Sequence, residues 1–191
     1  MTPAPDRDKL VVLDACVIYP TVQREMLLKT ARAGLYQPLW SERILEEWRL
    51  AVARKQGPED LARTEGAIAR MVAHWPGAAV TADPAAEAMI DLPDPADAHV
   101  LGTALAATAP LILTFNLRDF PARALAVHGI AARHPDGFLW EVLSGRTDEM
   151  SWVLGGVLTE QRITPDRARA ALKRARLPRL GKAWEHHSKA S

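Results

Sequence analysis

The sequence predicts an α/β fold of the α/β/α sandwich type, with a central, mostly parallel sheet covered by helices and a helical C-terminal extension. Short apolar or β-branched runs alternate with longer segments of helical periodicity. Of the 191 residues, 48% are hydrophobic, which is enough to bury a sizeable core. The connections are short, and no repeat or low-complexity tract interrupts them. We therefore expect one main domain with a small extension.

The first half of the chain opens with a predicted buried strand. Lys9–Ala15 (KLVVLDA) is β-branched and too short for a typical helix. Ser41 is a good N-cap residue and sets the start of a later helix. The other elements predicted here are helices over Val22–Ala33, Glu42–Lys55, Glu59–His74 and Ala85–Asp91 and a strand over Tyr36–Trp40.

The second half begins with a helix that opens at Pro93-Asp94-Pro95 and runs to about Ala107, because proline is tolerated in the first turn. The residues around His186-His187 are predicted to form a polar tail without regular structure. The other elements predicted here are strands over Leu111–Thr114 and Leu125–Ala131 and helices over Pro135–Leu143, Ser151–Thr159 and Pro165–Ala175.

Composition excludes several classes of protein. Cys16 is the single cysteine, so an intramolecular disulfide is excluded and a reducing compartment fits. No apolar run reaches the ~18 residues that a membrane-spanning helix needs. The polar stretch Met1–Lys9 does not resemble a secretion signal. We expect a cytoplasmic protein that does not interact with membranes.

Charge is unevenly distributed along the chain. Residues 161–191 hold nine Lys/Arg against two acids, a net charge of +7, whereas the remaining residues carry −6. A basic surface of this kind could contact the phosphates of a nucleic acid. A solvated helix face explains the same pattern, and the sequence leaves both interpretations open.

Several acids occupy positions where an α/β sheet places its ligands. Asp14 ends the first strand, and Asp119 follows the strand at Leu111–Thr114 after a short loop. Asp94 and Asp97 share one face of a helix start, and Glu47 lies one turn beyond a core residue of its helix. Carboxylates gathered in one crevice repel each other, and Mg²⁺ or Mn²⁺ would supply the counter-charge. The pattern predicts a metal site of the kind that hydrolyses phosphodiesters.

Each acid also has a structural interpretation. Asp94 and Asp97 could cap a helix and interact with its dipole, and Asp119 could cap the turn before Phe120. Glu47 could be a solvated helix residue. Asp14 is harder to explain in this way, because a charge at the end of a buried strand is costly unless it is paired or bound to a metal.

Four segments together resemble the PIN-domain family, which includes the VapC-type toxins of bacterial toxin–antitoxin pairs. Their order and spacing cover most of residues 9–135, and they are specific in combination, although no single segment is. The segments are VVLDACVIYP (11–20), LWSERILEEW (39–48), LPDPADAHVLGTALA (92–106) and LILTFNLRDFP (111–121). The resemblance implies an α/β/α nuclease fold over residues 9–135, with residues 136–191 as a helical C-terminal extension packed on or beside it.

The resemblance also implies the site residues. Asp14, Glu47, Asp97 and Asp119 match the family's four catalytic acids, with Glu46 as the alternative to Glu47 if the helix register slips by one. Of these, Asp14, Asp97 and Asp119 would be metal ligands.

Other positions match the family's supporting residues. Asp94 resembles the extra metal-binding acid of a D-P-x-D variant, and Thr114 and Asn116 match polar residues that hold the last acidic loop. Ala104 matches the alanine seven residues after the helix acid. Cys16 departs from the family's usual small polar residue, and the sequence predicts a buried apolar side chain there.

What the resemblance implies is an endoribonuclease that depends on Mg²⁺ or Mn²⁺, with RNA as substrate, an antitoxin protein as partner and a homodimer as the assembly. An RNA-processing nuclease outside a toxin pair and a non-enzymatic RNA-binding module remain alternatives. A haloacid-dehalogenase-type phosphatase needs a second aspartate where Cys16 stands. Dinucleotide binding needs a G-x-G-x-x-G motif, which does not follow the first strand.

Two further predictions concern residues outside the acids. His99 follows Asp97 by two positions and is expected on another side of the helix, in a structural role. Tryptophans are expected in packing positions, with base stacking open to one of them at most. The tryptophans concerned are Trp40, Trp48, Trp75, Trp140 and Trp152.

Overall fold

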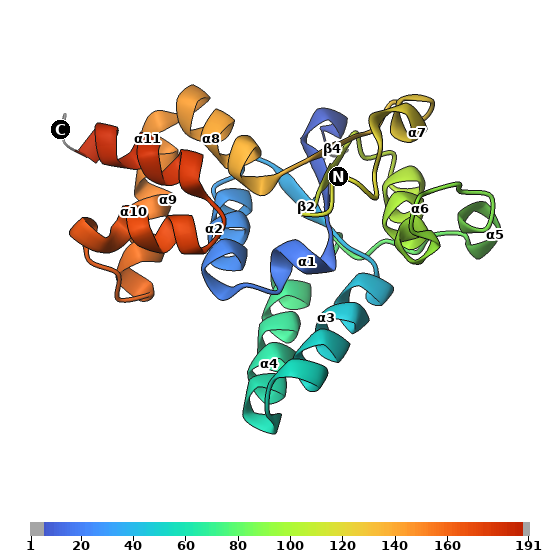
Figure 1. Ribbon diagram of the computed structural model, residues 1–191, viewed down its shortest axis with the longest axis horizontal. Coiled ribbons are helices and arrows are strands. Elements are labelled where there is room, and N and C mark those ends of the chain that lie inside the picture. The colour runs from blue at the N-terminus through green and yellow to red at the C-terminus, as the bar shows by residue number, and fades with distance from the viewer. Residues whose placement is uncertain (1–5, 189–191) are drawn as a thin grey trace. The chain divides into compact units, whose positions relative to one another are not determined.

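The computed structural model describes residues 6–188, which fall into two compact units. Of the described residues, the first unit, here called the sheet unit, comprises 6–19 and 37–132. The second, the helical unit, comprises 20–36 and 133–188. Figure 1 shows the elements of both units.

The sheet has the strand order β2-β1-β3-β4. Strand β1 is its centre: Val12 lies opposite Leu39 on one side and Ile112 on the other, and both pairings are parallel. All four residues of β1 are buried, which explains why this segment is a continuous apolar run. The strands are β1 (Leu10–Leu13), β2 (Gln37–Leu39), β3 (Leu111–Leu113) and β4 (Ala131–Arg133).

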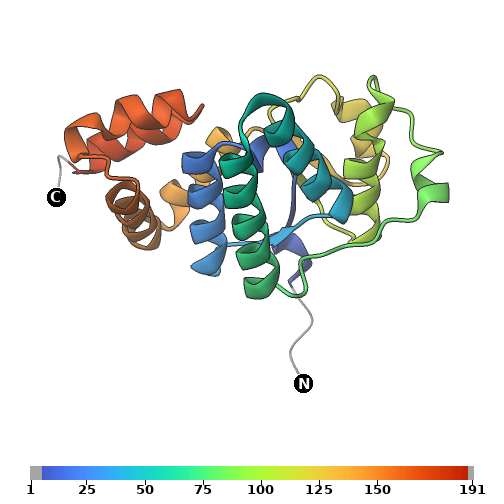
Figure 2. The ribbon, with the colours of Figure 1, turned by 90° about the horizontal axis from the view of Figure 1, so that it is seen from below.

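Helices flank the sheet. Helix α6 packs against β1 and β3, and α3 packs against both α4 and α6. The Ser41 hydroxyl accepts a hydrogen bond from the Ile44 amide, so the predicted N-cap is confirmed. Figures 1 and 2 both show α3 and α4 side by side. The helices of this unit are α1 (Ala15–Ile18), α3 (Glu42–Lys55), α4 (Pro58–His74), α5 (Pro84–Glu87), α6 (Ala98–Ala106) and α7 (Ala122–Ala126), with 3₁₀ turns η1 (Arg7–Lys9) and η2 (Pro95–Asp97).

One predicted strand is wrong. The segment Leu125–Ala131 begins inside helix α7, and the strand is limited to Ala131–Arg133. Pro121 is the N-cap of α7, and Gly129 has a φ of +66°, a conformation that interrupts a strand. The apolar run was too short for its periodicity to separate a helix from a strand.

The helical unit combines one early helix with the C-terminal ones. Helix α2 packs against α9, although more than a hundred residues separate them in the sequence. Asp136 is buried, and its carboxylate accepts hydrogen bonds from the Arg179 and Leu180 amides, each of 3.0 Å, at the start of α11. The helices are α2 (Thr21–Arg32), α8 (Pro135–Gly145), α9 (Thr147–Glu160), α10 (Pro165–Arg174) and α11 (Pro178–Ser188).

These observations confirm the predicted fold class, an α/β sheet flanked by helices with a helical extension. The unstructured tail predicted around His186-His187 is wrong, because both residues belong to α11. The domain division at residues 135 and 136 stays a prediction. Within residues 6–188, no helix combines the length and the apolar character that crossing a membrane requires.

Candidate active site

The centre of the candidate site lies where β1 and β3 end. Parallel neighbours bring Asp14 and Thr114 together, and the Thr114 hydroxyl donates a hydrogen bond of 2.6 Å to Asp14 Oδ2. Thr114 Oγ1 also accepts a hydrogen bond from the Asn116 amide. The Asn116 carbonyl in turn accepts one from the Asp119 amide. Both predicted supporting residues therefore hold the loop that carries Asp119.

Cys16 contributes a polar contact and not the buried apolar side chain that the sequence predicts. Its thiol is half-buried and donates a hydrogen bond of 3.0 Å to Asp14 Oδ2. Burial, reinforced by the charge of Asp14, raises the pKa of the Cys16 thiol well above its ordinary value. The thiol therefore stays protonated and remains a donor to Asp14, the role that a small polar residue would have here.

Asp97 is the acid whose pKa is raised by burial and by the charges of the other acids. Burial raises its pKa to about 6, and the negative charges of Asp14, Asp119, Asp94 and Glu47 reinforce the rise, in that order of size. All five predicted acids therefore interact electrostatically, although they come from separate segments of the chain.

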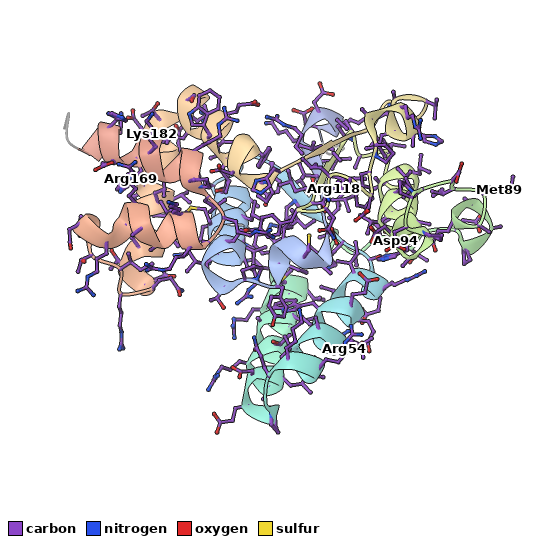
Figure 3. The ribbon with its side chains drawn as sticks, in the orientation of Figure 1. Arg54, Met89, Asp94, Arg118, Arg169 and Lys182 are labelled. Carbon is purple, nitrogen blue, oxygen red and sulfur yellow. The ribbon has the colours of Figure 1, made fainter. Side chains whose placement is uncertain are left out.

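The structure separates the roles of Asp94 and Asp97. The Asp94 side chain accepts a hydrogen bond of 2.9 Å from the Ala96 amide and so caps η2. Asp97 is the N-cap of α6 but makes no capping hydrogen bond with its side chain. The capping interpretation therefore describes Asp94, whereas the half-buried Asp97 carboxylate is left facing other carboxylates. Figure 3 labels Asp94 before α6 and Arg118 in the loop after β3.

Of the two neighbouring glutamates on α3, Glu47 faces the acids. Its charge acts on Asp97, and its side chain is 35% exposed. The Glu46 side chain is 52% exposed and lies 3.3 Å from Arg49, which also pairs with Glu42 and Glu65. The helix register therefore favours Glu47 over Glu46 as the residue of the site.

His99 is the neighbour of the site that sequence reasoning missed. It is 1% exposed, and its Nε2 lies 2.7 Å from Glu47 Oε1, so this residue of expected structural role contacts one of the predicted acids. The ring N–H is not aligned for a hydrogen bond, and both ring nitrogens are buried without a hydrogen-bond partner. The available signal was that His99 lies on the apolar face of a helix entering the core, where a polar ring needs a partner.

The donor set suits a hard divalent cation in its chemistry, since it consists of carboxylate oxygens that repel one another. Over residues 6–188, however, no three His, Cys, Asp or Glu side chains converge closely enough to form a ready-made metal site.

The PIN-domain family profile matches residues 10–118. That is more than half of the chain, and it contains Asp14, Glu47, Asp94 and Asp97 but ends one residue before Asp119. The chain belongs to the PIN-domain family.

A curated relative adds a partial similarity. The protein named "Putative ribonuclease VapC50" from Mycobacterium tuberculosis is 47% identical over 47 residues, which cover 25% of this chain and 28% of that relative. The alignment thus spans about a quarter of each of the two proteins. No solved structure matches this chain.

The raised pKa of Asp97 generates a test of the acid cluster. Its pKa is near 4 in the unfolded chain and about 6 in the folded one, so ionisation weakens the fold as pH rises from about 4 to about 6. After allowance for solvent screening, Asp97→Asn should raise the melting temperature in EDTA by roughly 2–6 °C at pH 7. The gain should disappear below about pH 4.

Differential scanning fluorimetry across pH measures this effect. Glu46→Gln is the matched control and should move the melting temperature much less, because Glu46 is exposed and does not act on Asp97. A lower melting temperature for Asp97→Asn at pH 7 would show that Asp97 serves the fold as a capping acid.

Proposed function

We propose that this PIN protein is a metal-dependent endoribonuclease that hydrolyses RNA phosphodiester bonds. The observation that carries the proposal is the half-buried Asp97 carboxylate, whose pKa is raised first by burial and then by the charges of Asp14, Asp119, Asp94 and Glu47. Family membership supports a nuclease, and the relative's name supports RNA as the substrate.

Asp14, Asp97 and Asp119, with Asp94 beside them, would hold Mg²⁺ or Mn²⁺. Such an ion, when bound, polarises the phosphodiester and lowers the pKa of a water molecule. The partial exposure of Asp97 and Asp119 leaves room for water beside the carboxylates, which suits Mg²⁺ because it keeps several water ligands.

Other residues of the chain would orient the carboxylates and position the attacking water. Thr114 and Cys16 donate to the same oxygen of Asp14 and so fix the orientation of that carboxylate. The backbone hydrogen bond between Asn116 and Asp119 fixes the loop that carries a second carboxylate, whose charge acts on Asp97. Glu47 is partly exposed and can accept a hydrogen bond from the attacking water. His99 limits the positions open to Glu47, because its ring lies against that carboxylate.

We further propose that the nuclease is the toxin of a toxin–antitoxin pair, with an antitoxin protein as its partner and a homodimer as its assembly. The support is the toxin-type name of the partial relative from Mycobacterium tuberculosis. This role is separate from the chemistry, because the same site could serve RNA processing outside such a pair.

The two adjacent glutamates of α3 provide a matched test of the site. Glu47→Gln should lower the rate of RNA cleavage by about 100-fold or more, since residues of one metal site act as a unit. Glu46→Gln should stay close to the parent rate, because Glu46 pairs with Arg49 at the surface. Cleavage of a labelled RNA with Mn²⁺ measures both, with EDTA and Asp14→Asn as controls. Equal rates for the two variants, or cleavage that persists in EDTA, would reject the site as proposed.

His99 is expected to position Glu47. His99→Leu removes the polar contact with Glu47 at similar volume, whereas His99→Gln keeps a polar side chain near the position of Nε2. Cleavage should fall about 10- to 100-fold in the leucine variant and less in the glutamine variant. Mn²⁺ affinity, measured by calorimetry, should follow the same order. If the two variants lose activity and Mn²⁺ affinity equally, His99 serves only to fill the core.

The toxin role can be tested in growing bacterial cells. Induction of the parent chain should arrest growth, and Asp14→Asn, produced to the same level, should not. Co-expression of the protein encoded beside it should relieve the arrest if that protein is the antitoxin. Normal growth with an active, well-expressed parent chain would exclude the toxin role and leave the nuclease intact.

A further inference from the structure

The helical unit contains a cleft of about 690 Å³ that the proposed reaction does not use. One side comes from α2 and the residue after it, and the other from α9. Residues from α9 at positions i, i+3, i+4 and i+7 line it, so one helix face forms that side. These four residues are Trp152, Gly155, Gly156 and Thr159.

Trp152 is the most unusual residue of the cleft. It is 77% exposed, whereas Trp40 and Trp48 are at most 1% exposed in the sheet unit. The next two residues of α9, Val153 and Leu154, are buried, so the helix places the indole on its outer side. Trp152 therefore does not occupy a packing position, and it is a candidate for the base-stacking role that the sequence leaves open to one tryptophan. An indole held at the edge of a cleft is a surface suited to contact with a ligand ring.

The two glycines beside Trp152 are not explained by packing. A Cβ added at Gly155 would meet nothing within 4 Å, and one at Gly156 would meet only the Lys29 Nζ, at an ordinary 3.7 Å. Glycine in a helix interior lowers stability relative to alanine. Neither glycine is required by a close neighbour. Gly155 leaves the helix face near the indole uncovered, and the Lys29 ammonium lies beside Gly156.

Charge indicates the class of ligand. Over its described residues, 20–36 and 133–188, the helical unit carries 13 Lys/Arg against 8 Asp/Glu, a net charge of +5, whereas the sheet unit carries −5. An enzyme whose catalytic acids lie in an acidic unit needs a basic surface elsewhere to attract a polyanion. Arg32 lines the cleft and is exposed, and Lys29 is held there by an ion pair with Glu160.

We propose that this cleft binds one nucleotide of single-stranded RNA, outside the catalytic site. The base stacks on Trp152 over the helix face that Gly155 leaves uncovered, and Arg32 contacts a flanking phosphate. A planar base fits a bare helix face beside an indole, and the positive charge of the unit favours nucleic acid over a peptide. The inference rests on the proposed function, because it takes RNA as the substrate.

The test measures RNA binding separately from cleavage, in the full chain carrying Asp14→Asn so that the RNA stays intact. The probe is a labelled single-stranded RNA of ten nucleotides, followed by fluorescence anisotropy. Trp152→Ala should weaken binding roughly 5- to 100-fold, and Trp152→Phe should weaken it less. Binding of duplex RNA should be the same in all variants, because its bases are not free to stack. Arg32→Ala should reduce the slope of log affinity against log salt by about 0.7.

A cleft-filling variant separates lost binding from lost folding. Gly155→Leu should weaken binding as Trp152→Ala does, while its melting temperature stays equal or rises, because leucine favours helix and its Cβ meets nothing within 4 Å. Adenosine monophosphate at millimolar concentration should compete with the RNA in the parent chain if a free nucleotide suffices. If adenosine monophosphate does not compete, the cleft binds a base only when the base belongs to an RNA strand.

The inference is overturned if Trp152→Ala and Gly155→Leu bind the single strand as tightly as the parent. It is also overturned if Trp152→Ala changes only the oligomeric state in sedimentation, since the cleft would then be a protein contact. If the variants weaken binding but the parent chain cleaves no RNA, the proposed nuclease fails and the nucleotide site stands.

Discussion

Repulsion among carboxylates is the constraint on which the candidate site depends. Two parallel strands end side by side, and the fold places Asp14 at the end of one and the loop to Asp119 after the other. Asp97 is half-buried among these charges. Its raised pKa means that ionising this carboxyl costs more free energy in the folded chain than in water. A fold selected for stability alone would not gather acids in this way, so the arrangement indicates function.

Neutral donors relieve part of that repulsion without cancelling it. The Thr114 hydroxyl and the Cys16 thiol both direct hydrogen bonds to Asp14, and neither brings a charge. Asp14 can therefore stay buried and oriented while its negative charge remains available to a cation. Cys16 shows that a thiol with a raised pKa can replace a small polar residue in this position.

The two units carry opposite net charges, which fits catalysis in the sheet unit and nucleic-acid binding in the helical unit under the proposed function. The sheet unit holds the acids, and the helical unit holds the excess of basic residues together with the exposed Trp152. Under the proposed function, a site rich in carboxylates repels a phosphate backbone, so the attraction of RNA has to come from other residues. The helical unit carries a net positive charge, and its cleft is where we propose that a base binds.

The sequence by itself determined the features that depend on local patterns. The apolar run before Asp14 predicted β1, Ser41 predicted the start of α3, and the spacing of Asp94 and Asp97 placed both at a helix start. The tertiary structure decided what depends on how distant segments pack. Thr114 and Asp14 are 100 positions apart, and the packing of α3 against α6 selected Glu47 over Glu46 and brought His99 against it. The exposure of Trp152 was likewise decided by packing, because helical periodicity shows which residues share a face but not which face the rest of the fold covers.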